Sequence, residues 1–288
     1  MHRTHRLARL AVHRDGLQFA TTDAGPATGE VVVCLHGFPQ GPEAYDAVVP
    51  RLTAQGLRVL VPEQRGYCAT ARPPRPRDYA LRELVADVLA VADAAGAERV
   101  HLLGHDWGGV VAWATAAWHP DRVASLTVLS QAHPAAFRAA VVRSSQALRS
   151  AYVGFFQLPV LPERLLLARG GAGLAGSLRR TGLPAGLAEG YARRHREPGR
   201  LSAALNWYRA PGPAARVGPV DVPVTYLHGR RDPFYSATAV ARTGEHVRGP
   251  YRRIELDATH WLPELEPAAV ARAVTETVLA AAEVPGRS

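Results

Sequence analysis

The stretch Gly104-His105-Asp106-Trp107-Gly108-Gly109 lies between two apolar segments, residues 100–103 and residues 110–114. This order predicts a strand, a sharp turn and a helix. The spacing matches the turn Gly-x-nucleophile-x-Gly, in which small flanking residues permit a strained backbone that lifts the central side chain to a helix N-terminus. Asp106 is therefore the first candidate catalytic residue.

The central residue of this turn is an aspartate, where a serine is usual. A carboxylate is already ionised near neutral pH and favours displacement at a saturated carbon, which gives an alkyl ester on the enzyme. The helix dipole and free backbone N–H groups help to hold it as an anion. A turn that merely contains an aspartate explains the stretch equally well, so the rest of the chain has to supply the partners of Asp106.

Composition is typical of a globular protein with a sizeable core, since 47% of the 288 residues are hydrophobic and 20% are charged. This length allows one large domain with an insertion, or two small domains. The net charge is +9, and every Lys/Arg position is an arginine. The arginines are scattered and form no aromatic-interleaved stripe, so we expect no nucleic-acid partner.

Cys34 and Cys68 are the only cysteines and form no CxxC pair, which favours reduced thiols and a cytoplasmic location. Residues 1–6 are basic but lack the apolar segment of a signal peptide. No apolar run approaches membrane-spanning length, so we expect no membrane partner. A monomer and a homodimer are both compatible with the sequence.

Strand and helix patterns alternate along most of the chain. Residues 7–22 read as a hairpin around Asp15-Gly16. The expected strands and helices that follow are strands 31–35, 57–61, 123–129, 222–227 and 251–256, and helices 43–55, 78–95 and 267–282. Between them, residues 133–219 show only helical segments broken by glycine and proline. We therefore predict an α/β fold with a mostly parallel sheet flanked by helices, built from residues 1–132 and 220–288, with a helical cap at 133–219.

An ester on Asp106 needs a general base for its hydrolysis. His260 follows the last predicted strand, which matches the chain order nucleophile, acid, histidine of such folds. The acid is expected after the preceding strand, where Asp232 lies. The other possible position, after strand 123–129, holds Ser130 and Gln131, neither of which can serve. The backbone N–H groups of Phe38 and Trp107 occupy the positions expected of an oxyanion hole.

The sequence resembles the epoxide-hydrolase branch of the α/β-hydrolase superfamily, which also contains haloalkane dehalogenases. The resemblance covers nearly the whole chain and is carried by His36-Gly37-Phe38-Pro39, Arg65-Gly66-Tyr67, residues 104–109 and His260-Trp261. It departs from the family at Glu63, where an aspartate is more common before the arginine. Within the predicted cap, residues 150–157 and 205–209 resemble the two segments that bear the ring-opening tyrosines.

This resemblance implies an epoxide hydrolase that needs no cofactor, with Tyr152 and Tyr208 as proton donors. Opening an epoxide expels an alkoxide, and a phenol is protonated at neutral pH and able to donate to it. The expected partners are a small-molecule epoxide and water. We expect no metal, because no His, Cys or Asp cluster has ligand spacing.

Three alternatives compete with this interpretation. A haloalkane dehalogenase would use the same aspartate, but Phe38 stands where many of these enzymes place a halide-binding asparagine. Fluoroacetate-type dehalogenases place an arginine after the nucleophile, where this chain has Trp107. A non-catalytic binding protein of the same fold would not need the set Asp106, Asp232, His260, Tyr152 and Tyr208.

Overall fold

The computed structural model describes residues 8–211 and 216–283. Residue 7 of the predicted hairpin and residues 212–215 of the predicted cap lie outside the described residues. The same holds for residues 1–6 and 284–288.

The described chain forms an eight-stranded sheet with the order β1-β2-β4-β3-β5-β6-β7-β8. The strands are β1 (Ala8–Arg14), β2 (Leu17–Ala24), β3 (Val31–Leu35), β4 (Arg58–Pro62), β5 (Val100–His105), β6 (Val123–Leu129), β7 (Val224–Gly229) and β8 (Tyr251–Leu256). From β4 to β8 all neighbouring strands are parallel, whereas β1 and β2 join one edge antiparallel. The α/β class and the mostly parallel sheet are thus confirmed.

The hairpin expected near the N-terminus is present, with Asp15 and Gly16 in its turn at φ values of 50° and 76°. Two residues with positive φ match the turn that joins tightly twisted strands. The predicted strand 31–35 is fully buried because helices cover both faces of the sheet. Its side chains alternate between the two faces, so that Val33 and Leu35 join one apolar cluster while Val32 and Cys34 join another.

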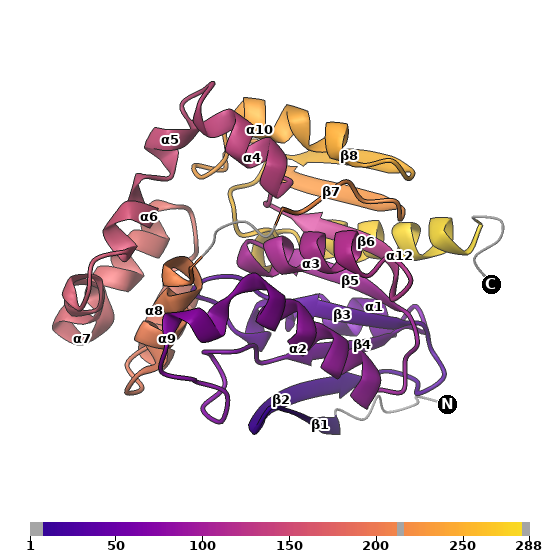
Figure 1. The fold of residues 1–288 in the computed structure, drawn as a ribbon, viewed down its shortest axis with the longest axis horizontal. Helices are drawn as coiled ribbons and strands as arrows, with labels where there is room; N and C mark the ends of the chain where they lie inside the picture. The colour runs from indigo at the N-terminus through magenta and orange to yellow at the C-terminus, as the bar shows by residue number, and fades with distance from the viewer. Residues whose placement is uncertain (1–7, 212–215, 284–288) are drawn as a thin grey trace.

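Two pairs of helices cover the two faces of the sheet (Figure 1). Helices α2 (Leu81–Ala94) and α3 (Trp107–Trp118) pack together on one face, α3 against β5 and β6. Helices α1 (Val49–Thr53) and α12 (Pro267–Ala282) pack together on the other, α12 against β6 and β7. The sheet therefore has a separate apolar core on each side.

The prediction of one helix over residues 43–55 was wrong. The chain forms a short 3-10 helix, η1 (Pro42–Tyr45), and then α1, in whose first turn Pro50 lies. In a continuous helix Pro50 would occupy an interior position, where it removes a backbone hydrogen bond and clashes with the preceding turn. The proline therefore starts a new helix.

Six helices separate β6 from β7, and no described strand interrupts them. They are α4 (Pro134–Val141), α5 (Gln146–Arg149), α6 (Ala151–Phe156), α7 (Leu161–Arg180), α8 (Ala185–Arg194) and α9 (Arg200–Arg209). Helices α5 to α9 lie together beside one end of the sheet (Figure 1). Helix α7 is kinked at residues 168–171, where Gly170 and Gly171 have positive φ. Helix α4 instead packs against α10 (Ala237–Arg242).

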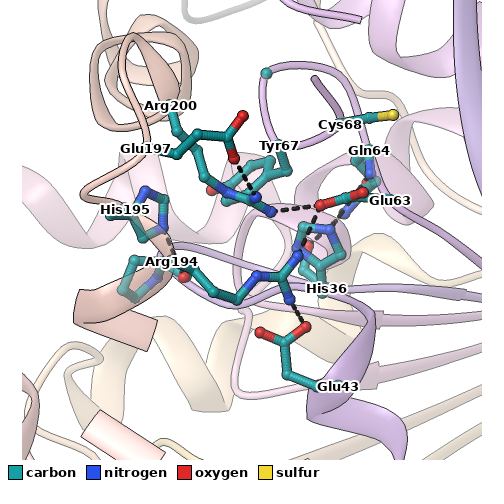
Figure 2. A network of polar contacts seen from close by, with 12 residues as sticks. His36, Glu43, Glu63, Gln64, Tyr67, Cys68, Arg194, His195, Glu197 and Arg200 are labelled. Carbon is teal, nitrogen blue, oxygen red and sulfur yellow. Dashed lines mark hydrogen bonds and ion pairs between the residues drawn. The ribbon is translucent and has the colours of Figure 1, made fainter. Parts of the chain in front are cut away.

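Ion pairs connect the inserted helices to loops at the end of the sheet (Figure 2). Glu63, which follows β4, accepts hydrogen bonds from Arg194 at 2.7 Å and from Arg200. Arg194 also pairs with Glu43, and Arg200 pairs with Glu197 at 3.1 Å. Glu63, at a position where an aspartate is more common in the family, is thus paired with one arginine from α8 and one from α9. Because these groups are mostly part-buried, their attraction is less screened than that of surface pairs.

No helix in the described part of the chain is long and apolar enough to cross a membrane.

We predict that Gly108→Ala destabilises the protein by about 1–3 kcal/mol, because the added methyl group would meet the backbone carbonyl of Leu35. Gly186→Ala is the matched control. Gly186 lies in α8 with open space around it, and alanine favours a helix by roughly 0.5–1 kcal/mol. Chemical denaturation of both variants checks this, and equal stability changes would contradict the close packing of Gly108 on β3.

Candidate active site

Asp106 lies between the end of β5 and the start of α3, with φ 50° and ψ −122°. A non-glycine residue in this region is strained, and such strain persists only where the surroundings hold it. Its carbonyl accepts hydrogen bonds from the N–H groups of Gly109 and Val110 at 2.8 and 3.1 Å, which closes the first turn of α3. Gly104 packs against the backbone of Gly108 across the turn, where a side chain at either position would not fit. The predicted strand–turn–helix is therefore present.

The Asp106 carboxylate faces two donors. Its Oδ1 accepts a hydrogen bond from the backbone N–H of Phe38 at 2.8 Å, and its Oδ2 lies 3.6 Å from Nε2 of His260. Burial alone would raise the pKa of Asp106, but His260, His105 and the Phe38 N–H outweigh burial and lower this pKa. The carboxylate is consequently anionic and ready to act as a nucleophile.

His260 bridges two carboxylates. Its Nδ1 lies 2.8 Å from Oδ2 of Asp232, and the other oxygen of Asp232 accepts a hydrogen bond from the N–H of Phe234 at 2.8 Å. Burial opposes a charge on this imidazole, but Asp232 and Asp106 outweigh it and raise the pKa of His260 to about 10. Asp232 thus orients the ring, and Nε2 is directed toward Asp106.

A cavity of about 400 Å³ opens above Asp106. Its walls are mostly apolar and come from both the sheet loops and the inserted helices. The lining residues include Phe38, Asp106, Tyr152, Phe155, Phe156, Leu166, Leu174, Leu178, Tyr208, Phe234, His260 and Trp261. A largely apolar cavity with a few convergent polar groups is the usual form of a small-molecule site.

Tyr152 and Tyr208 reach this cavity from α6 and α9, although they are far apart in the sequence. Their ring centroids are 6.2 Å apart and the rings are close to perpendicular. Burial, Asp106 and Asp232 raise the pKa of Tyr152, and burial, Tyr152 and Asp106 raise that of Tyr208. Both phenols therefore hold their protons at neutral pH and are able to donate them.

The indole ring of Trp107 packs on two aromatic side chains of α9. Trp107 is not among the residues that line the cavity. Its ring packs edge-to-face on the rings of Tyr208 and Trp207, with centroid distances of 5.1 and 5.9 Å. Only its backbone N–H was predicted to act, so the side chain has a packing role that the sequence did not indicate.

Several residues of the site were missed in the sequence. The ring of Phe234 packs against those of His260 and Tyr152, with centroid distances of 4.7 and 5.6 Å. Its backbone N–H donates a hydrogen bond to Asp232. Gln40 accepts a hydrogen bond from the backbone N–H of Gly37, within the loop that carries Phe38. Its place in that loop was the only available signal, because a glutamine has no chemistry that identifies it in a sequence.

Among the described residues, no group of three or more His, Cys, Asp or Glu side chains could hold a metal ion. Cys34 and Cys68 are both free and buried.

The model of the alpha/beta hydrolase fold family matches residues 30–267, and the chain belongs to this family. Within it, the chain belongs to the epoxide-hydrolase branch, as its relatives show. Epoxide hydrolase A of Mycobacterium tuberculosis is 33% identical, and the match covers 92% of this chain and 95% of that protein. The AB hydrolase superfamily protein YfhM of Bacillus subtilis is 30% identical over 92% of this chain and 96% of its own.

Solved structures agree with this fold. The crystal structure of Epoxide Hydrolase A from Mycobacterium thermoresistibile superposes with a TM-score of 0.81. The two sequences are 25% identical, and the match covers 94% of this chain and 98% of the other.

The charge on His260 predicts a pH dependence of stability. The pKa of His260 is raised from the ordinary value of about 6.5 to about 10. Protonation therefore stabilises the fold fully below about pH 6.5, and this contribution is lost as the pH rises toward about 10. We expect the difference in unfolding free energy between wild type and His260→Gln to fall by a few kcal/mol across this range, at about 1.4 kcal/mol per pKa unit. Denaturant titrations at a series of pH values measure it, and a constant difference would contradict the raised pKa.

Proposed function

We propose that this protein hydrolyses epoxides to vicinal diols through an ester formed on Asp106. The observation that carries the proposal is the placement of one anionic carboxylate and two protonated tyrosines around a single apolar cavity. A carboxylate supplies the nucleophile, and the phenols supply the proton that an alkoxide leaving group requires. The branch to which the chain belongs and the names of its relatives support the same activity.

The first step forms a bond between an Asp106 oxygen and a ring carbon of the epoxide, while the bond from that carbon to the ring oxygen breaks. The ring oxygen takes a proton from Tyr152 or Tyr208, which both line the cavity with Asp106. Oδ2 of Asp106 faces His260, whereas Oδ1 is held by the Phe38 N–H. The product of this step is a neutral hydroxyalkyl ester.

The second step hydrolyses this ester. Forming the ester removes the negative charge of Asp106, one of the two carboxylates that raise the pKa of His260. His260 can then release its proton, which restores the tyrosine, and act as a base for water. Water attacks the carboxyl carbon of Asp106, and the oxyanion forms next to the Phe38 N–H. The leaving diol oxygen takes the proton back from His260. The second proton of the water, left on the Asp106 carboxyl, then passes to His260, which restores the Asp106 anion and the charged His260 of the resting site.

The inserted helices act in this proposal as a cap over the site, because they supply the tyrosines and much of the cavity wall. We include residues 133–219 in this cap, as the sequence predicts. The required partners are a small epoxide and water, and the residues of the site supply every proton in the two steps without a cofactor. The cytoplasmic location expected from the cysteines stays a prediction.

Dehalogenation uses the same nucleophile but needs N–H donors around the leaving halide. Phe38, which stands where many haloalkane dehalogenases place a halide-binding asparagine, lines the cavity with a side chain that has no N–H donor. The pair of half-buried tyrosines at the cavity therefore favours epoxides over haloalkanes.

We predict that His260→Gln forms the ester but hydrolyses it at least about 100-fold more slowly, because general-base catalysis is lost. Mixing the variant with an aryl epoxide and measuring intact protein mass should show one added substrate mass, and peptide mapping should place it on Asp106. In the wild type, a single turnover in heavy-oxygen water should label Asp106 and transfer unlabelled oxygen to the diol. Label found directly in the diol, with no adduct on the variant, would show that Asp106 acts as a base instead.

We predict that Tyr152→Phe or Tyr208→Phe slows ester formation by roughly tenfold or more, and that the double change nearly abolishes it. Each phenol can partly replace the other, so the combined loss exceeds either single one. Burst kinetics with an aryl epoxide measure the step directly, and Phe155→Leu is a control that alters the cavity wall without removing a donor. Wild-type ester formation by the double variant would remove the tyrosines from the mechanism.

A further inference from the structure

The loop after β3 carries the Phe38 N–H, and contacts within the loop fix its shape. The N–H of Gln40 donates to the carbonyl oxygen of Gly37 at 3.0 Å, and the N–H of Gly37 donates to Oε1 of Gln40 at 2.8 Å. The Phe38 N–H points out of this turn and donates to Asp106. None of these contacts involves the inserted helices. The position of the loop beneath those helices therefore depends on other residues.

One side chain of the inserted helices bonds to this loop directly. His195 follows the last residue of α8 and lies beside Arg194 (Figure 2). Its Nε2 lies 2.8 Å from the backbone carbonyl oxygen of Pro39, the residue after Phe38. A carbonyl oxygen can only accept, so Nε2 carries the proton. The imidazole is 1% exposed, and its Nδ1 has no hydrogen-bond partner in the described part of the chain.

His195 is neutral in this position. Burial lowers its pKa to about 3, helped by three nearby arginines, although the hydrogen bond to Pro39 opposes this shift. A neutral imidazole has a single N–H. Near neutral pH the ring therefore has one proton to donate, and Pro39 accepts it.

The inserted helices also pack around the ring of Phe38. Its centroid lies 5.4 Å from that of Tyr208 on α9 and 5.5 Å from that of Phe156 on α6. The ring of His195 lies 6.1 Å away. Three segments of the insertion thus contact Phe38, and one of them also holds the carbonyl group that follows it. The place of the Phe38 N–H consequently depends on the insertion as well as on the sheet.

We propose that His195 is a positioning residue that holds the oxyanion loop, residues 36–40, so that the Phe38 N–H meets the oxyanion formed while the Asp106 ester is hydrolysed. The helices that deliver the two tyrosines then also complete the oxyanion hole, and both chemical steps depend on one docked arrangement. The role in hydrolysis rests on the proposed function, whereas the hold on the loop does not.

The two steps use this N–H differently. In the resting site Asp106 already accepts a hydrogen bond from Phe38, and its carboxylate loses charge as the ester forms. In hydrolysis a neutral ester carbonyl becomes an oxyanion, so the donor matters most in the transition state. A displaced Phe38 N–H should therefore slow hydrolysis and leave ester formation nearly unchanged.

The kinetic test compares His195→Phe with His195→Gln in single turnovers of an aryl epoxide. We expect His195→Phe, a flat ring without the donor, to slow ester hydrolysis about tenfold and to change ester formation by less than about twofold. His195→Gln keeps an N–H donor within reach of Pro39 and should restore most of the hydrolysis rate. Equal slowing of both steps in His195→Phe, or a glutamine variant as slow as the phenylalanine variant, would overturn the proposal.

Arg194→Gln is the matched control. It removes ion pairs with Glu43 and Glu63 at the same end of α8 but leaves the bond from His195 to Pro39. General loosening of the inserted helices also displaces Tyr208, so the ratio of the hydrolysis rate to the ester-formation rate should stay near its wild-type value. A selective loss of hydrolysis in this variant as well would show that the bond to Pro39 is not its cause.

A spectroscopic test does not depend on turnover. In ligand-free wild type near neutral pH, ¹⁵N NMR should show His195 protonated at Nε2 alone. The Phe38 amide should exchange with solvent about tenfold faster in His195→Phe and at nearly the wild-type rate in His195→Gln. A proton on Nδ1 alone, or unchanged exchange in His195→Phe, would overturn the hold on the loop. Failure of the wild type to form any ester would overturn the proposed function alone.

Discussion

The strained backbone at Asp106 is the constraint on which the rest of the structure depends. Positive φ at this residue turns the chain from β5 directly into α3 and leaves the carboxylate at the start of the helix. Glycine at positions 104 and 108 allows the two elements to approach closely enough. Buried hydrogen bonds and packing on both sides hold the turn, as a strained conformation requires. The Asp106 carboxylate is thus fixed by the core of the protein and not by a loop.

Charge balance is the second constraint on the site. Asp106 and Asp232 lie on either side of His260, and neither anion would be stable in this apolar setting without it. The same balance changes during the proposed reaction, because the ester is neutral. In the proposed reaction the histidine is therefore a cation in the resting site and a base in the intermediate.

The inserted helices bring a different kind of chemistry to the same cavity. The sheet loops supply charged groups, whereas α6 and α9 supply two phenols that burial keeps protonated. Contacts such as those of Glu63 with Arg194 and Arg200 hold these helices against the sheet loops. The relative positions of Asp106 and the two tyrosines therefore depend also on polar contacts between residues that do not line the cavity.

The sequence by itself determined the class of fold and the turn at Asp106, and it predicted Asp232 and His260, which the structure brings together with Asp106. These features depend on local patterns: period-two and period-3.6 hydrophobicity, glycine spacing around the nucleophile, and the order of polar residues after successive strands. The helix over residues 43–55 was wrong because Pro50 outweighed an otherwise helical pattern. Tyr152 and Tyr208 were identified by resemblance, since no spacing relates residues on different helices. Tertiary structure alone decided that both face Asp106, that Trp107 packs outside the cavity, and that His195 reaches the loop that carries Phe38. Contacts between distant segments depend on how helices and loops pack, and this packing leaves no local signal in the chain.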